Sequence, residues 1–185
     1  MSDAAARPTR RLRSRGRSAQ PGRPRTAARL AAVQALYQAE HVGAPAEAVL
    51  EEFVRHRVGG QEGAPLAAGP LDEGGAPGAD VPLLARILRG WAANAETLDR
   101  VIAAALAEDW PLPRLDPVLR ALLRAASAEL LDAKGPPARA VINEYMDVAH
   151  GFFAGEEPRF ANGVLDRIAR TLRAAEFADV ADARG

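Results

Sequence analysis

Residues 139–170 read RAVINEYMDVAHGFFAGEEPRFANGVLDRIAR and contain two apolar patterns with the spacing of an α-helix. Apolar side chains recur every three or four residues over 141–152, which predicts one helix with a single buried face. Pro158 then restarts the chain as a second helix, because proline suits the first helical position, where its missing N–H is not needed. The same spacing continues over 160–172. The stretch therefore predicts two consecutive helices joined by a short break.

Asn162 and Gly163 lie inside the second apolar pattern, although an Asn-Gly pair on its own is typical of a turn. The apolar spacing continues through both residues, so the pattern favours an unbroken helix. A glycine at such a position suggests that a neighbouring helix comes close to it.

Length and composition limit the class of protein. The chain has 185 residues, which favours one domain over two. It has no cysteine, so it holds neither a disulfide framework nor a thiolate metal site. No apolar run reaches membrane-spanning length, and the N-terminus has no secretory leader. These features fit a cytoplasmic protein with no membrane contact.

Charge is distributed unevenly along a chain with no net charge. Residues 1–29 hold nine arginines and one acid, Asp3, so the remainder is correspondingly acidic. Residues 1–25 have almost no apolar side chains, which predicts an arginine-rich arm that is disordered when free. The arm could be a solvated tail or an organellar transit peptide. A basic segment on an acidic body suggests an anionic partner. Given the segments that follow it along the chain, we favour an RNA-binding arm that orders on contact.

The remaining patterns predict an all-α domain over residues 26–176, with about seven helices packed as two small antiparallel bundles. Residues 59–81 are rich in Gly and Pro and predict a flexible insert, and residues 177–185 a flexible tail. Helix starts are expected at Thr26, Pro45, Pro82, Asn94 and Asp116, from capping side chains or from proline in the first turn.

We find no catalytic, cofactor or metal site in the sequence. A phosphate-binding loop needs a Gly-Lys-Ser/Thr ending, and the one lysine, Lys134, is followed by Gly and Pro. The three histidines, at positions 41, 56 and 150, lack metal-ligand spacing. Glu144 could be mistaken for a general base, but we favour a buried or capping role for it. The sequence therefore predicts a protein that is not an enzyme.

Three segments resemble the NusB family of transcription antitermination factors. They are VINEYMDVAHGF followed by PRFANGVLDRIA (141–152 and 158–169), RLAAVQALYQ (29–38) and LDPVLRALLRAASAELL (115–131). The resemblance covers about residues 25–175. One departure is Ser127-Ala128, where the family usually has an aromatic residue. A second is Thr26-Ala27-Ala28, where the family often has basic residues, so the basic charge lies further upstream.

The resemblance implies a non-catalytic factor that binds the boxA element of nascent ribosomal RNA together with NusE, a small-subunit ribosomal protein. Such a pair acts on elongating RNA polymerase within an antitermination complex. Arginines would attract phosphates, and aromatic rings would stack on unpaired bases. The RNA-binding residues that the resemblance implies are Arg23, Arg25, Arg29, Tyr37, Gln38, Arg159 and Phe160. The residues that face NusE, and the choice between monomer and homodimer, stay open.

Several alternatives remain at this stage. Tyr37 and Phe160 lie on apolar stripes and could be core residues. Arg120 and Arg124 could form a basic strip or surface ion pairs. The whole protein could be an α-helical interaction scaffold with a basic tail. It could also be related to the RNA-binding part of ribosomal RNA cytosine methyltransferases, although those need a further catalytic domain.

Overall fold

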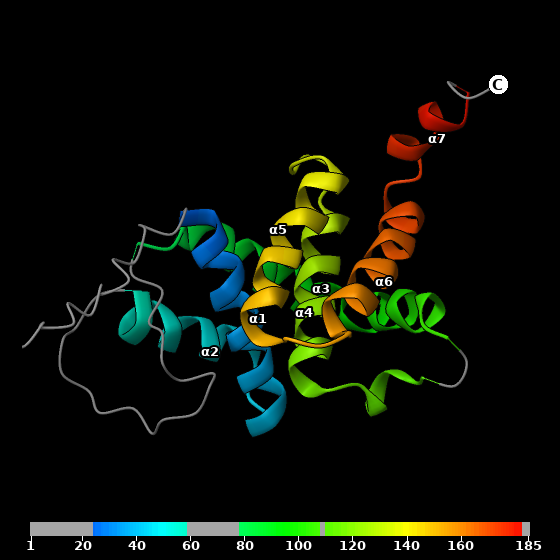
Figure 1. Cartoon of the computed structure of the whole chain (residues 1–185). Helices are drawn as coiled ribbons and strands as arrows, with labels where there is room; N and C mark the ends of the chain where they lie inside the picture. The colour runs from blue at the N-terminus through cyan, green and yellow to red at the C-terminus, as the bar shows by residue number, and fades with distance from the viewer. Residues whose placement is uncertain (1–23, 59–77, 108–109, 183–185) are drawn as a thin grey trace, which may run out of the picture.

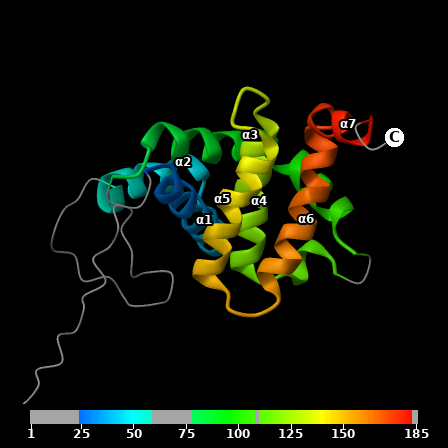
Figure 2. The same cartoon turned by 45° about the horizontal axis from the view of Figure 1, so that its top comes forward.

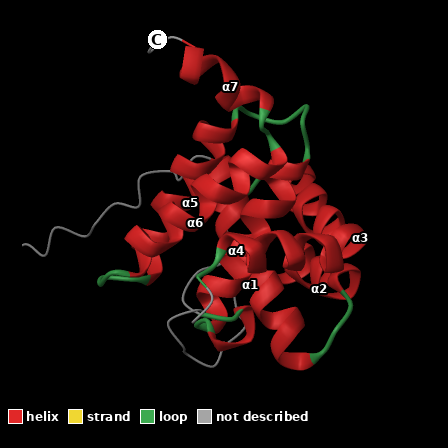
Figure 3. Cartoon of the chain, turned by 90° about the vertical axis from the view of Figure 1, so that its right-hand side faces the viewer, coloured by secondary structure: helices red, strands yellow, loops and turns green. Residues whose placement is uncertain are grey.

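The computed structural model describes residues 24–58, 78–107 and 110–182. The elements are α1 (Pro24–Val42), α2 (Ala46–Phe53), a π-helical turn η1 (Val54–Val58), α3 (Val81–Ala105), a 3-10 turn η2 (Leu112–Arg114), α4 (Pro117–Leu131), α5 (Ala138–Phe152), α6 (Glu157–Leu172) and α7 (Ala175–Asp182). Every regular element in these ranges is a helix, as Figure 3 shows. The predicted all-α class is confirmed.

Helix α4 lies at the centre of the molecule. It contacts α1, α3, α5 and α6, and Figure 2 shows α4, α5 and α6 side by side with α1–α3 next to them. Most of its leucines are almost completely buried, among them Leu122, Leu123 and Leu130 at 0% exposure. Alanines at many of the other positions leave room for neighbouring helices to approach. One continuous core therefore joins the two groups of helices.

Two aspartates start helices by the same chemistry. The Asp116 carboxylate accepts the backbone N–H groups of Val118 and Leu119 at 2.8 and 3.2 Å, as predicted for α4. Asp80 accepts the N–H of Leu83 at 3.0 Å and so caps α3. The sequence had placed Asp80 inside the flexible insert 59–81, of which residues 59–77 lie outside the described residues.

The predicted helix start at Asn94 is wrong. Helix α3 runs without a break from Val81 to Ala105, and the Asn94 side-chain amide donates to the Gly90 carbonyl of the preceding turn at 2.9 Å. The start expected at Thr26 also moves, because α1 already begins at Pro24. The last two residues of the expected arm are thus helical, and residues 1–23 lie outside the described residues.

Helix α7 occupies most of the segment that was expected to be a flexible tail. The Arg173 guanidinium, between α6 and α7, donates to the Leu130 carbonyl at 2.7 Å and also to the Asp132 carbonyl. Glu176 accepts a hydrogen bond from Arg173 and one from the backbone N–H of Ala138 at 2.7 Å. These bonds attach the α6–α7 corner to the loop between α4 and α5. Figure 1 shows α7 beyond the end of α6.

Candidate nucleic-acid interface

Arg29, expected to contact RNA, is instead a buried structural residue with 2% of its surface exposed. Its Nε and Nη2 atoms donate to the two carboxylate oxygens of Glu129 at 2.9 and 2.6 Å, which is a bidentate pair. Its Nη1 donates to Glu144 at 2.9 Å, and the Thr26 hydroxyl donates to the same Glu144 oxygen at 2.8 Å. Burial is the largest single influence on the pKa of Arg29 and would lower it, but the hydrogen bond to Glu129 and the charges of Glu129, Tyr145 and Glu144 together outweigh burial and raise that pKa. Burial and these bonds leave Arg29 little surface for an RNA phosphate.

The bonds of Arg29 to Glu129 and Glu144 connect three helices, because Arg29 lies on α1, Glu129 on α4 and Glu144 on α5. The expectation that Glu144 has a buried or capping role fits its two contacts, although it is only partly buried. The Tyr145 hydroxyl is buried nearby and has no hydrogen-bond partner among the described residues. Burial and then the Glu129 carboxylate raise the pKa of Tyr145 well above its usual value.

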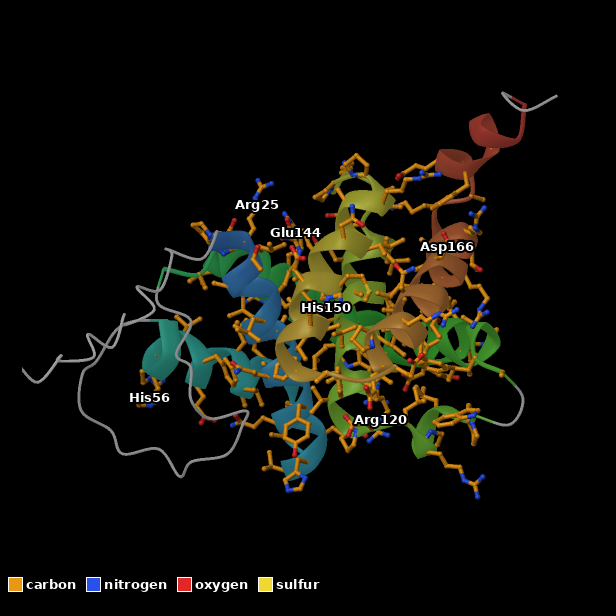
Figure 4. All side chains as sticks on the ribbon, in the orientation of Figure 1. Arg25, His56, Arg120, Glu144, His150 and Asp166 are labelled. Atoms are coloured by element: carbon orange, nitrogen blue, oxygen red, sulfur yellow. The ribbon has the colours of Figure 1, made fainter. Side chains whose placement is uncertain are left out.

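Arg25 lies at the start of α1 and is exposed. Its side chain is 69% exposed, and its guanidinium is 3.9 Å from Asp80, too far for a strong pair. It lines a pocket of about 470 Å³ together with Arg86 and Lys134. Figure 4 shows Arg25 at the end of the molecule opposite Arg120. Arg25 is therefore available to an anionic partner, whereas Arg23 lies outside the described residues.

Tyr37 and Gln38 lie near the other end of α1. Tyr37 is half-buried against the core, and its ring stacks on His41 with centroids 5.8 Å apart and planes 6° apart. The Gln38 amide donates to Glu52 of α2 at 2.9 Å. With a rise of 1.5 Å per residue, Tyr37 is about 18 Å from Arg25 along the helix. The predicted residues on α1 therefore belong to two separate regions.

Arg159 and Phe160 lie in the first turns of α6. Arg159 is exposed, and Phe160 is partly buried against the core. The Phe160 ring contacts Trp110 with centroids 5.9 Å apart and planes inclined by 44°. Trp110 itself is 55% exposed. Sequence reasoning assigned no site role to Trp110, which precedes a proline and shows no helical spacing.

Arg120 and Arg124 form ion pairs, as one of the two alternatives expected. Arg120 and Arg124 both bind Glu40 of α1, at 2.8 and 3.0 Å, and Arg124 also binds Asp99 of α3 at 2.8 Å. The Arg124 guanidinium additionally covers the ring of Trp91, 4.9 Å from its centroid. These cations are engaged within the fold and leave little free charge for a phosphate.

Gly163 does not admit a neighbouring helix, so that expectation is wrong. A Cβ added at Gly163 would meet no atom within 4 Å, and both Asn162 and Gly163 are exposed on α6. Helix α6 nevertheless runs through them, as the apolar spacing predicted.

The described residues contain no group of three or more His, Cys, Asp or Glu side chains that could hold a metal ion. His150, for example, shares a hydrogen bond with the Met146 carbonyl, four residues earlier on its own helix. None of the helices in the described ranges has the length and apolar character needed to cross a bilayer.

Comparison with known proteins places these features in a family. The model of the NusB family matches residues 26–170. The transcription antitermination protein NusB of Granulibacter bethesdensis is 54% identical over 159 residues, covering 84% of this chain and 93% of that protein.

Solved structures agree with this comparison. Thermotoga maritima NusB superposes with a TM-score of 0.63 at 30% identity, covering 84% of this chain and 97% of that one. A chain from a structure of the antitermination factors NusB and NusE with double-stranded RNA has a TM-score of 0.61 at 21% identity, over 81% and 98% of the two chains. At 21% identity, the likeness to this second structure shows a shared fold alone. The family match and the extent of these similarities together show that this chain belongs to the NusB family.

Proposed function

We propose that this protein is a transcription antitermination factor that binds boxA-type single-stranded RNA together with NusE and acts on elongating RNA polymerase. Its family membership supports the role, because a relative that is 54% identical over 159 residues is named a transcription antitermination protein. A protein of the same fold has been solved with NusE and RNA, which supports the choice of partners. Relatives named for a role in transcription also support a non-catalytic protein.

The observation that carries the RNA-binding part is the exposed arginine-aromatic group at the start of α6. Arg159 is exposed, beside the contacting rings of Phe160 and Trp110. Arginine attracts phosphate without regard to sequence, and aromatic side chains stack on unpaired bases. Single-stranded RNA offers both features, whereas paired RNA hides its bases.

Tyr37 and Gln38 extend this region onto α1. In Figure 1 the last turns of α1, the end of α5 and the start of α6 lie at the same end of the molecule. The Gln38 amide is engaged with Glu52 in the free protein, so RNA contact by Gln38 requires that exposed bond to exchange.

Arg25 forms a second contact region at the opposite end of α1. We propose that it attracts RNA phosphates together with Arg23, while Arg29 serves the fold alone. Arg86 and Lys134 also line the pocket beside Arg25. Arg86 pairs with Asp132 at 3.6 Å, so Lys134 adds most of the further positive charge where the strand would pass.

The test is fluorescence anisotropy of a labelled boxA-type RNA against a scrambled RNA of equal length, with and without NusE. We expect preference for boxA, increased by NusE. Phe160→Ala and Arg159→Gln should each weaken binding, and Arg159→Gln should also lower the slope of log affinity against log salt by about 1.

Arg170→Gln is a matched control for charge, because Arg170 lies on the same helix and is also exposed but pairs with Asp166 at 2.7 Å, far from Phe160. Circular dichroism verifies that each variant keeps its helical content. Equal binding of both RNAs, unaffected by NusE and by Phe160→Ala, would contradict the proposal.

A further inference from the structure

The ring of Trp110 is exposed on the surface of the protein. In the described residues the exposed large apolar side chains are Val42, Trp110 and Leu131. Of these, Trp110 presents the only aromatic surface, at 55% exposure. Tryptophan offers a large flat area, and one edge of this ring is already supported by Phe160 at 5.9 Å. The open part of the ring can therefore receive a second flat group.

The chain next to Trp110 is held firmly. The Arg120 guanidinium donates to the carbonyls of Leu112, Pro113 and Leu115 at 3.4, 3.3 and 3.0 Å. The side chains of Leu112 and Leu115 are buried at 8% and 3% exposure. The turn η2 is thus attached both by its backbone and by its side chains. This attachment fixes the chain two residues after Trp110, and the Trp110 N–H donates to the Ala107 carbonyl at 2.9 Å. Ring stacking would therefore cost less ordering entropy than on a free loop.

Gly163 leaves the backbone of α6 uncovered one turn after Phe160. It lies three residues after Phe160, so the two positions are neighbours on one face of the helix. A mid-helix glycine is unfavourable relative to alanine, yet a Cβ at Gly163 would have free space in this protein. Among the described residues, no close contact at Gly163 explains the glycine. A ligand that approaches the bare backbone closely would explain it.

Charges of both signs surround these rings, because Glu156 and Glu157 are exposed too, and the arginines among them indicate a class of ligand. Arg159 precedes Phe160, Arg114 lies in η2, and both arginines are exposed. Flat rings flanked by exposed guanidinium groups suit a nucleobase with its attached phosphate, since arginine binds phosphate and aromatic rings bind bases. An aliphatic protein surface would leave these guanidinium groups without partners.

We propose that an unpaired RNA base stacks on Trp110, beside Phe160, while the sugar-phosphate backbone of the same strand passes over Gly163. This inference rests on the proposed function and adds Trp110 and Gly163 to the RNA-binding surface. Arg120 is a positioning residue in this surface, because it acts through η2.

Tryptophan fluorescence gives a direct readout. The chain has two tryptophans, so Trp91→Phe leaves Trp110 as the sole tryptophan. Titration of this variant with boxA-type RNA should quench or shift its emission, at the same RNA concentrations at which anisotropy reports binding. Trp110→Ala should weaken binding by about 5- to 100-fold, the range expected for the loss of one stacked base. Trp110→Phe, which keeps a flat ring, should retain most of the affinity.

Gly163→Ala separates a binding role from a structural one. We expect this variant to melt at a higher temperature than the parent protein and to bind RNA more weakly. Gly90→Ala is the matched control, because Gly90 is also inside a helix and a Cβ there would make only an ordinary contact, at 3.8 Å. It should leave RNA affinity unchanged.

Three outcomes would overturn the inference. RNA binding with unchanged Trp110 emission and unchanged affinity of Trp110→Ala would refute it and leave the proposed function intact. Emission that responds to NusE alone, and not to RNA, would make this face a protein contact. Absence of binding to any RNA would refute the inference and the proposed function together.

Discussion

Arg29→Met tests whether Arg29, the second arginine of α1, stabilises the fold. Methionine is similar to arginine in helix propensity, so α1 itself should change little. The substitution removes three short hydrogen bonds to Glu129 and Glu144, the longest of them 2.9 Å. It also leaves the Glu129 carboxylate, 3% exposed, without its cation.

The expected magnitude follows from this uncompensated charge. Removing one partner of a buried ion pair costs about 3–5 kcal/mol, a large part of the roughly 5–15 kcal/mol that stabilises a typical domain. With a urea slope of about 2 kcal/mol per molar, the unfolding midpoint should fall by roughly 1.5–2.5 M. Arg29→Lys should lie between, because an ammonium group cannot bind both carboxylate oxygens in the same fork.

The assay is urea unfolding followed by circular dichroism, with Arg25→Met as the matched control. Arg25 lies one turn earlier on the same helix, but its side chain is 69% exposed. Its replacement should change stability by no more than about 0.5 kcal/mol. RNA affinity should respond in the opposite way to stability. Arg25→Met should bind RNA more weakly than the parent protein, and Arg29→Met should bind with unchanged affinity under conditions where it is folded.

An unchanged urea midpoint for Arg29→Met, together with a loss of RNA affinity, would refute this reasoning. That result would mean that the guanidinium of Arg29 is available to RNA, and that the pair with Glu129 does not support the fold.

Three further predictions concern stability. Hydrogen bonds from the Ala138 N–H and then from Arg173 lower the pKa of Glu176 in the folded protein. The ionised Glu176 should therefore stabilise the fold above its unfolded pKa, near 4.5, and this stabilisation should be lost as pH falls through its folded pKa. In thermal melts, Glu176→Gln should remove this part of the acid sensitivity. Burial raises the pKa of Tyr145, so stability should decline as pH rises above about 10, the ordinary tyrosine value; Tyr145→Phe should decline less in alkaline urea titrations. Leu122 has 0% exposure, so Leu122→Ala should cost about 2–5 kcal/mol through a cavity, and an unshifted melting curve would contradict its place in the core.

Local chemistry was sufficient to predict most helix boundaries. Asp116 followed by Pro117 combines an acceptor with a residue that lacks an N–H, and α4 starts there. Asn94 has a similar local signal, but the packed apolar residues on both sides of it keep α3 continuous. Helix α7 was missed for a related reason. It is held by Arg173 and Glu176, whose partners lie about 40 positions earlier, and sequence spacing does not show such contacts.

The candidate site was less predictable, because the sequence alone does not show whether an arginine is buried or exposed. Arg29 lies four residues before Val33 and seven before Leu36, so helical spacing already places it on their buried face. This spacing was the available signal. Its acceptor, Glu129, is 100 positions away on helix α4. Trp110 carries no periodic signal at all, since its exposure depends on how Arg120 holds the neighbouring turn.

The two ends of α1 are fixed by different ion pairs, and this determines how an RNA could use the helix. At its first turns Arg29 attaches α1 to α4 and α5. At its last turns Glu40 attaches it to Arg120 and Arg124 of α4. Arg25 and Tyr37 are therefore held about 18 Å apart on a rigid helix. Because Arg120 also holds the turn that follows Trp110, the same contacts set the position of the aromatic rings. A strand that reaches both regions must fit this spacing, so a fixed protein frame would select an RNA by its length and by the position of its unpaired bases.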